Sequence, residues 1–187
     1  MDATIERYIK DGHHERALGA IVDTHGPSLG RFLAASLGSR EDGEEALQDT
    51  LLEVLASLSA YRGERGLRPW LFAIARHVAL THTRKRLRRR SLWARFFAGP
   101  DRAHEDPSAD SEARLTLNGA ITRLTPNLRD ALLLRYQLGL DATEVADTLG
   151  ITHDAARKRI SQALARLRAD LVEPAELAAP ALSESRS

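Results

Sequence analysis

The chemistry open to this chain is limited, because the residues that usually perform catalysis are missing or poorly spaced. Its 187 residues include no cysteine, which excludes disulfides, thiolate metal sites and thiol nucleophiles. Of the seven histidines, His77 and His82 are five positions apart and do not share a helical face well, and no HExxH motif occurs. We therefore expect no metal, no cofactor and no catalytic residue, and we expect that the protein is not an enzyme.

Positive charge is concentrated in one stretch of the chain. Residues 61–95 carry 11 basic side chains and 1 acidic one, whereas the whole chain has a net charge of only +1. Such an excess indicates a polyanionic partner, with a solvated helical face as the alternative. Tyr61, Trp70 and Phe72 flank a glycine-punctuated loop at 62–66. Because cations bind phosphates and flat rings stack on unpaired bases, this combination suits opened DNA; core packing is the alternative role for Trp70.

A helix-turn-helix spacing occupies residues 141–167. Asp141 and Glu144 resemble a capping box that opens the first helix, and Gly150 ends it. The second helix would bury Ala156 and present its polar side chains outward. These are Thr152, His153, Asp154, Arg157, Lys158 and Ser161. Such a helix can enter the major groove, where arginine and lysine reach phosphates or guanine edges. An ordinary helical hairpin with a basic face is the alternative.

An acidic face lies on an earlier predicted helix, whose apolar stripe is Leu47, Leu51, Val54, Leu55 and Leu58. Mostly opposite this stripe are Glu45, Gln48, Asp49 and Glu53. Negative side chains repel DNA, so we expect this face to meet a protein, with simple solvent exposure as the alternative.

Helical periodicity extends over nearly the whole chain, and no strand is predicted. The fold class is therefore all-α, with two small helical domains joined by a flexible linker, the C-terminal domain being a helix-turn-helix. The predicted segments are 1–91, an acidic linker at 92–113, 114–172, and a disordered tail at 173–187. We expect Gly26-Pro27 to bend or break one helix and another helix to begin near Pro69. No apolar run could insert into a membrane, and no signal peptide is present.

Three of these segments together resemble the extracytoplasmic-function (group 4) branch of the bacterial sigma factors. EALQDTLLEVL at 45–55 resembles the polymerase-binding helix of sigma region 2. YRGERGLRPWLFAIAR at 61–76 resembles the motif that follows it in this family. LTPNLRDALLLRY at 124–136, followed by 139–167, resembles region 4. The resemblance covers roughly 15–91 and 114–171.

The resemblance implies two kinds of partner, core RNA polymerase and promoter DNA. Core polymerase would be bound by Glu45, Gln48, Asp49 and Glu53. The −10 element would be melted and bound by Tyr61, Arg62, Gly63, Glu64, Arg65, Leu67, Trp70, Arg76, His77, Arg84 and Lys85. The −35 element would be bound by Thr152, His153, Asp154, Arg157, Lys158 and Ser161. An anti-sigma factor is the expected regulator, and the cytoplasm is the expected location, which the absence of cysteine fits.

Four positions depart from the family pattern. Leu67 stands where the loop usually has an aromatic residue, Pro69 replaces a threonine, His77 an asparagine and Ala156 a valine. Because of these departures, the exact DNA sequence of the −10 element stays unassigned. The general role implied by the resemblance does not change. A helix-turn-helix repressor or activator that acts without polymerase is the competing interpretation, and it explains neither the acidic face nor the aromatic basic loop.

Overall fold

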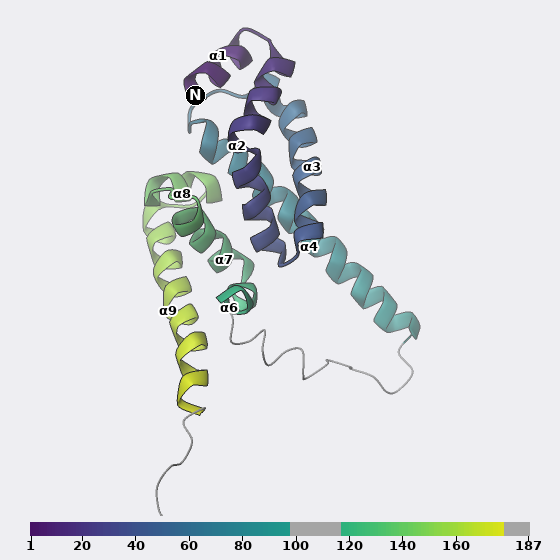
Figure 1. Cartoon of the computed structure of the whole chain (residues 1–187), viewed down its shortest axis with the longest axis vertical. Coiled ribbons are helices and arrows are strands. Elements are labelled where there is room, and N and C mark those ends of the chain that lie inside the picture. The colour runs from purple at the N-terminus through teal and green to yellow at the C-terminus, as the bar shows by residue number, and fades with distance from the viewer. Residues whose placement is uncertain (98–116, 178–187) are drawn as a thin grey trace, which may run out of the picture.

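The structure is a computed structural model that describes residues 1–97 and 117–177, with side chains described at 1–89, 117 and 119–171. All regular structure in these ranges is helical, and it forms two domains, as the sequence predicted (Figure 1). The N-terminal domain consists of α1 (Asp2–Lys10), α2 (His14–Leu37), α3 (Arg40–Ser57), η1 (Leu58–Ala60) and α4 (Leu67–Phe97). The C-terminal domain consists of α6 (Leu117–Arg123), α7 (Pro126–Leu132), η2 (Leu133–Gln137), α8 (Ala142–Leu149) and α9 (His153–Leu177).

A close contact between α2 and α3 organises the N-terminal domain. A Cβ atom at Gly43 would lie only 2.7 Å from the backbone of Ala34, so glycine alone fits this position. On the other side of α2, the rings of Phe32 and Phe72 pack edge to face with their centroids 5.5 Å apart. This contact fixes α4 against α2, and α4 in turn positions the loop that precedes it.

Two expectations about helix boundaries need correction. The helix α2 continues through Gly26-Pro27, where a bend or break was expected. Pro27 is exposed, and the buried Ile21 and Leu29 on either side anchor the helix to the core. Packing of both halves therefore offsets the one backbone hydrogen bond that proline cannot donate. The helix α4 begins at Leu67, slightly earlier than its expected start near Pro69.

The predicted linker and tail lie only partly within the described residues. Helix α4 runs to Phe97, so residues 92–97 are helical although the linker was expected to begin at 92. Helix α9 runs to Leu177, so 173–177 are helical although disorder was expected there. The remainder of both segments, 98–113 and 178–187, lies outside the described residues. No helix in the described ranges is long and apolar enough to span a bilayer.

The two domains pack directly against each other, which the sequence did not predict. Buried side chains of α8 and η2 join the same hydrophobic cluster as those of α2 and α4. A polar contact crosses the same boundary, because Arg76 of α4 lies 2.7 Å from Asp130 of α7. The C-terminal domain thus rests on α2 and α4 rather than standing apart from them (Figure 1).

Candidate protein-binding and nucleic-acid-binding surfaces

The loop between η1 and α4 is a tight, glycine-dependent turn. Gly63 and Gly66 both have φ of +76°, a left-handed conformation that other residues rarely adopt. The amide of Gly66 donates to the carbonyl of Gly63 at 3.2 Å, which closes the turn. Its charged side chains, Arg62, Glu64 and Arg65, are all exposed. The turn therefore presents two cations and a carboxylate to solvent.

Leu67 and Trp70 anchor this loop to the domain. Leu67 is only 2% exposed, so it holds the start of α4 in the core and is not available for a DNA contact. This burial argues against the DNA contact that was expected for Leu67. Trp70 is partly buried and packs against the core, which favours the structural role that the sequence left open. One side of Trp70 still lines a small pocket together with residues 60–65.

Tyr61 lines the same pocket, packs against Trp70, and is held in place by a residue of α1. Its ring lies 4.8 Å from the ring of Trp70, and its hydroxyl donates to the carboxylate of Glu6 at 2.7 Å. Burial raises the pKa of Tyr61, and the hydrogen bond to Glu6 raises it further. The phenol therefore stays protonated and remains a donor to Glu6. No pattern in the sequence indicates this role of Glu6, because Glu6 and Tyr61 are 55 positions apart.

Helix α4 carries the remaining residues of the expected −10 set, and they fall into two classes. His77, Arg84 and Lys85 are exposed. Arg76 is instead turned toward the C-terminal domain, where it binds Asp130 and also donates to the side chain of Asn127 at 3.1 Å. In the observed arrangement Arg76 is therefore engaged and is not presented to a ligand.

The contact between Arg76 and Asp130 is largely shielded from water. The side chain of Asp130 is 5% exposed and that of Arg76 is 19% exposed. Burial raises the pKa of the Asp130 carboxyl, while the neighbouring guanidinium of Arg76 opposes that rise. A charged pair at such a boundary fixes the geometry of the contact more than it adds stability.

The acidic face of α3 is open to solvent and includes apolar side chains that the sequence analysis missed. Glu45, Gln48, Asp49 and Glu53 are all exposed. Between them lies Leu52, which is 66% exposed, and Leu55, assigned to the buried stripe, is 41% exposed. Leu52 falls outside the 3.6-residue stripe formed by the other apolar residues of α3, and this position in the sequence could have indicated its exposure. A mixed apolar and acidic patch of this kind is typical of a protein contact.

A shallow hollow adjoins this patch and connects it to α4. It is lined by Asp49, Leu52 and Glu53 from α3 and by His77 and His82 from α4. The ring of His82 lies 2.8 Å from the carboxylate of Asp49 and ties the two helices together. The acidic patch and the exposed His77 are therefore on adjoining surfaces of the same domain.

The helices α8 and α9 form a helix-turn-helix, and its helix cap, glycine stop and buried alanine are those that the sequence predicted. Asp141 accepts from the amide of Glu144 at 2.9 Å, and the Glu144 carboxylate accepts from the Asp141 amide at 2.8 Å, which completes the capping box. Gly150 ends α8 with φ of +63°. Ala156 is buried against α8. The six outward residues are all exposed: Thr152, His153, Asp154, Arg157, Lys158 and Ser161.

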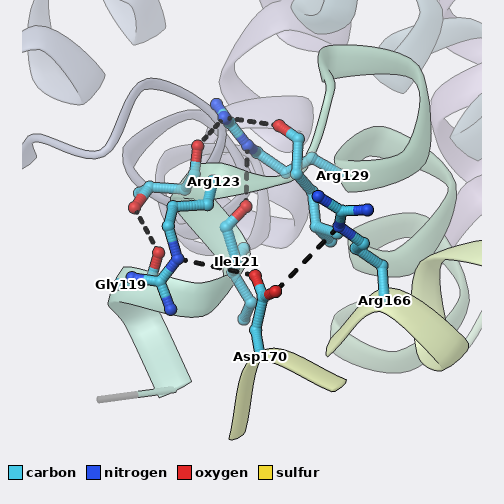
Figure 2. A network of polar contacts seen from close by, with 8 residues as sticks. Gly119, Ile121, Arg123, Arg129, Arg166 and Asp170 are labelled. Carbon is cyan, nitrogen blue, oxygen red and sulfur yellow. Dashed lines mark hydrogen bonds and ion pairs between the residues drawn. The ribbon is translucent and has the colours of Figure 1, made fainter. Parts of the chain in front are cut away.

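An arginine near the middle of α7 holds the C-terminal domain together (Figure 2). The guanidinium of Arg129 donates to the carbonyls of Ile121 at 3.1 Å and of Leu124 at 3.0 Å, and also to that of Thr122. A further donation, to the carbonyl of Ser36 on α2, crosses to the N-terminal domain. Burial lowers the pKa of Arg129, and these carbonyls compensate for the lost hydration.

Polar contacts also tie the last helix, α9, to α6. Arg123 of α6 and Arg166 of α9 both contact the carboxylate of Asp170, at 3.5 Å and 4.0 Å (Figure 2). Helix α6 is thereby tied to α9, so the orientation of α9 depends on the supporting helices. Within residues 1–97 and 117–177, no three histidine, aspartate or glutamate side chains come together as a metal site requires.

Comparison with known proteins matches each domain to one family. Residues 21–89 match Sigma-70 region 2, and residues 114–167 match Sigma-70 region 4. The first match covers α2 from Ile21, α3, the loop and α4 as far as Arg89, while the second covers α6 to α8 and α9 as far as Leu167. Helix α1, which supplies Glu6, precedes the first match.

Two sigma factors are similar in sequence to this chain over most of their own length. The ECF RNA polymerase sigma factor SigC of Mycobacterium tuberculosis is 32% identical over 169 residues, which are 87% of this chain and 86% of SigC. The RNA polymerase sigma factor CarQ of Myxococcus xanthus is 28% identical over 164 residues, 88% of this chain and 93% of CarQ.

Two solved structures have a similar fold. CnrH, determined in complex with the cytosolic domain of CnrY, has a TM-score of 0.69 at 23% identity, covering 92% of this chain and 97% of CnrH. The sigma factor RpoE of Bartonella quintana, determined with the anti-sigma factor NepR, has a TM-score of 0.66 at 24% identity, covering 82% of this chain and 96% of RpoE.

Proposed function

The chain belongs to the sigma-70 family, in its extracytoplasmic-function branch, and we propose that it directs RNA polymerase to promoters by binding two DNA elements at once. As a sigma factor it is a transcription initiation factor that works with RNA polymerase on promoter DNA. The observation that carries the proposal is the separation of charge on the N-terminal domain. One exposed face is acidic and apolar, and another exposed surface is basic.

The patch on α3 is the proposed site for core polymerase. Glu45, Gln48, Asp49 and Glu53 supply polar contacts, and Leu52 supplies apolar surface that is otherwise exposed to water. Burying a largely exposed leucine is favourable by about 1.5–3 kcal/mol. A patch of this composition fits a protein partner better than it fits DNA.

The loop and α4 are the proposed site for the opened −10 element. The small pocket beside the packed rings of Tyr61 and Trp70 is also lined by Arg62 and Arg65, and this combination of aromatic surface and cations suits a base turned out of the duplex. Gly63 allows the turn that exposes these side chains. The expected contacts that remain are Tyr61, Arg62, Gly63, Glu64, Arg65, Trp70, His77, Arg84 and Lys85, with Arg76 joining them only when it leaves Asp130.

Helix α9 is the proposed site for the −35 element. Its exposed first turns carry Arg157 and Lys158, and α8 supports it from behind. Each domain alone makes a modest contact. Polymerase holds the two at a fixed spacing, so that the second contact forms at high effective concentration. The protein would act in the cytoplasm, without chemistry of its own, and under the control of an anti-sigma factor, as NepR is for RpoE of Bartonella quintana.

Run-off transcription with purified core polymerase on a library of genomic fragments tests this function. We expect defined transcripts with the full chain and none with core alone. The double variant Gln48→Lys with Asp49→Lys should lose core binding while keeping its helical circular dichroism. A protein that binds a duplex operator tightly without polymerase, and gives no transcripts with it, would instead be the repressor or activator considered above.

A further inference from the structure

A cleft between helix α1 and the loop is not among the contacts assigned above. Helix α1 and the start of α4 lie at the same end of the N-terminal domain (Figure 1). The cleft, which we call the α1 cleft, is lined by Glu6, Ile9 and Lys10 of α1 and by Leu58 and Ser59 of η1. Its volume is about 560 Å³. Small-molecule sites span about 300–1,000 Å³, so the α1 cleft has room for a nucleotide.

The α1 cleft adjoins the small pocket beside Trp70. Tyr61, Arg62 and Gly63 line both of them. The small pocket has a volume of only about 170 Å³, which is below the range of small-molecule sites and leaves room for no more than one base. A strand whose base enters the small pocket therefore brings a neighbouring nucleotide to the α1 cleft.

The walls of the α1 cleft match the parts of a nucleotide. Ile9 and Leu58 are buried apolar side chains, and Tyr61 adds an aromatic ring, which together suit the flat face of a base. Lys10 and Arg62 line the same cleft and are exposed, which suits a phosphate. Apolar surface and cations are thus combined in one cavity.

Glu6 favours an unpaired base over a paired one. One of its carboxylate oxygens accepts from the Tyr61 hydroxyl at 2.7 Å, and no other described residue donates to this carboxylate. A carboxylate can accept several hydrogen bonds, so capacity remains. The N–H groups on the pairing edge of a base have lost their partners in opened DNA, whereas in a duplex they are already bonded. The remaining capacity of Glu6 therefore suits opened DNA.

Resting on the proposed function, we propose that the α1 cleft binds a second unpaired nucleotide of the opened strand, next to the one whose base enters the small pocket. Its base would lie against Tyr61 with its pairing edge toward Glu6, and Lys10 would bind its phosphate. Because every base carries an N–H group on that edge, the contact would not select one base. Helix α1 precedes residues 21–89, so the family match does not include its part of the site.

Abasic scanning tests for two nucleotide sites. The probe is an oligonucleotide with the opened strand of a promoter recovered by run-off selection, and fluorescence anisotropy measures its binding to holoenzyme. An abasic site at either of two successive positions should weaken binding about fivefold or more, as expected when a contact between a base and an aromatic ring is lost.

Two neighbouring residues of η1 assign these positions. Ser59 lines the α1 cleft and not the small pocket, Ala60 lines the small pocket and not the α1 cleft, and both are exposed. Ser59→Trp should fill the α1 cleft and remove the effect of the abasic site at one position. Ala60→Trp should remove the effect at the adjacent position instead. Both variants should keep the helical circular dichroism and the core affinity of wild type.

Lys10→Gln tests the phosphate contact. The slope of log affinity against log salt concentration should fall by about 0.7, the value for one contact with a single strand. Arg7→Gln is the matched control, because Arg7 is also an exposed cation of α1 but does not line the cleft. This variant should keep the wild-type slope.

Three results would overturn the inference. The first is that Ser59→Trp and wild type respond equally to the abasic site at every position. The second is an unchanged salt slope in Lys10→Gln. The third is a loss of core affinity in Ser59→Trp, because the α1 cleft would then take a protein. Failure of wild-type holoenzyme to bind the intact oligonucleotide, or to transcribe any fragment, would refute the proposed function itself.

Discussion

The contact between the two domains can be locked by a single engineered disulfide. A Cβ atom on Gly38, at the end of α2, would lie 3.9 Å from the Cβ atom of Thr122 on α6. Bridged cysteines have Cβ atoms about 3.5–4.5 Å apart, so the geometry is suitable. The double variant is Gly38→Cys with Thr122→Cys, and since the chain has no native cysteine, no competing pair can form. Thr122→Cys also removes the Cγ2 atom that would crowd position 38 at 3.0 Å.

The expected stabilisation follows from the length of chain that the bridge closes. The loop from position 38 to 122 contains 85 residues, and the chain-entropy relation gives about 4.6 kcal/mol at 25 °C. Gly38 has φ of +73°, so a cysteine there costs about 1–2 kcal/mol in left-handed backbone strain. Oxidation should therefore raise the free energy of unfolding by about 4.6 kcal/mol over the reduced double variant. Measured against wild type, the net gain should be about 3 kcal/mol. Urea unfolding of both forms measures these differences.

The lock should also abolish promoter-directed transcription if the proposed function is correct. The centres of elements at −10 and −35 are about 25 base pairs apart, or about 85 Å along the duplex. Domains joined by a bridge between α2 and α6 cannot reach both sites. We expect run-off transcription by the oxidised protein to fall at least tenfold, because one DNA contact and its effective concentration are lost.

The redox state supplies the control for this experiment. Reduction should restore transcription to the level of the Gly38→Cys single variant, while wild type should respond to neither treatment. Full activity of the oxidised, fully bridged protein would refute the idea that the domains must separate, and with it the simultaneous binding of two distant elements.

Three further predictions concern single surfaces. Leu52→Asp should weaken binding to core polymerase about tenfold or more, measured by fluorescence anisotropy, whereas Leu117→Asp at a similarly exposed position should not. Glu6→Ala should reduce binding to a single-stranded −10 oligonucleotide several-fold by freeing the tyrosine it holds, and Glu6→Gln, which can still accept that hydrogen bond, should restore most of it. Replacing Arg157 and Lys158 by alanine should weaken binding to promoters containing the −35 element by at most a few kcal/mol and leave core affinity unchanged, as footprinting would show.

Local signals in the sequence predicted local structure well. The capping box at Asp141 and Glu144 and the stop at Gly150 were predictable because their partners lie within three or four residues and have one favourable geometry. The amphipathic pattern of α3 likewise predicted the exposed Gln48 and Asp49. These features depend on helix geometry alone and not on the arrangement of the two domains.

Features that depend on distant partners could not be predicted in this way. Arg76 has the residue type and position of a DNA contact, yet its partner Asp130 is 54 positions away. Pro27 signals a break, but packing on both sides of it keeps α2 continuous. Leu55 fits the apolar period of α3 but emerges at the edge of the core. In each case tertiary packing, which a single sequence does not display, decided the outcome.

Arg76 connects these observations, because its guanidinium is held by an anionic partner that the contact between the domains supplies. In the closed arrangement that partner is the buried carboxylate of Asp130. Separation of the domains would return Asp130 to water, which removes the burial that raises the pKa of its carboxyl, and would release Arg76 for a phosphate. Arg76 thus exchanges the carboxylate of Asp130 for a DNA phosphate. The electrostatic free energy that is lost when the domains separate is therefore largely recovered once DNA is bound. We therefore expect Arg76→Gln to weaken domain closure and −10 binding together, whereas Asp130→Asn should weaken closure alone.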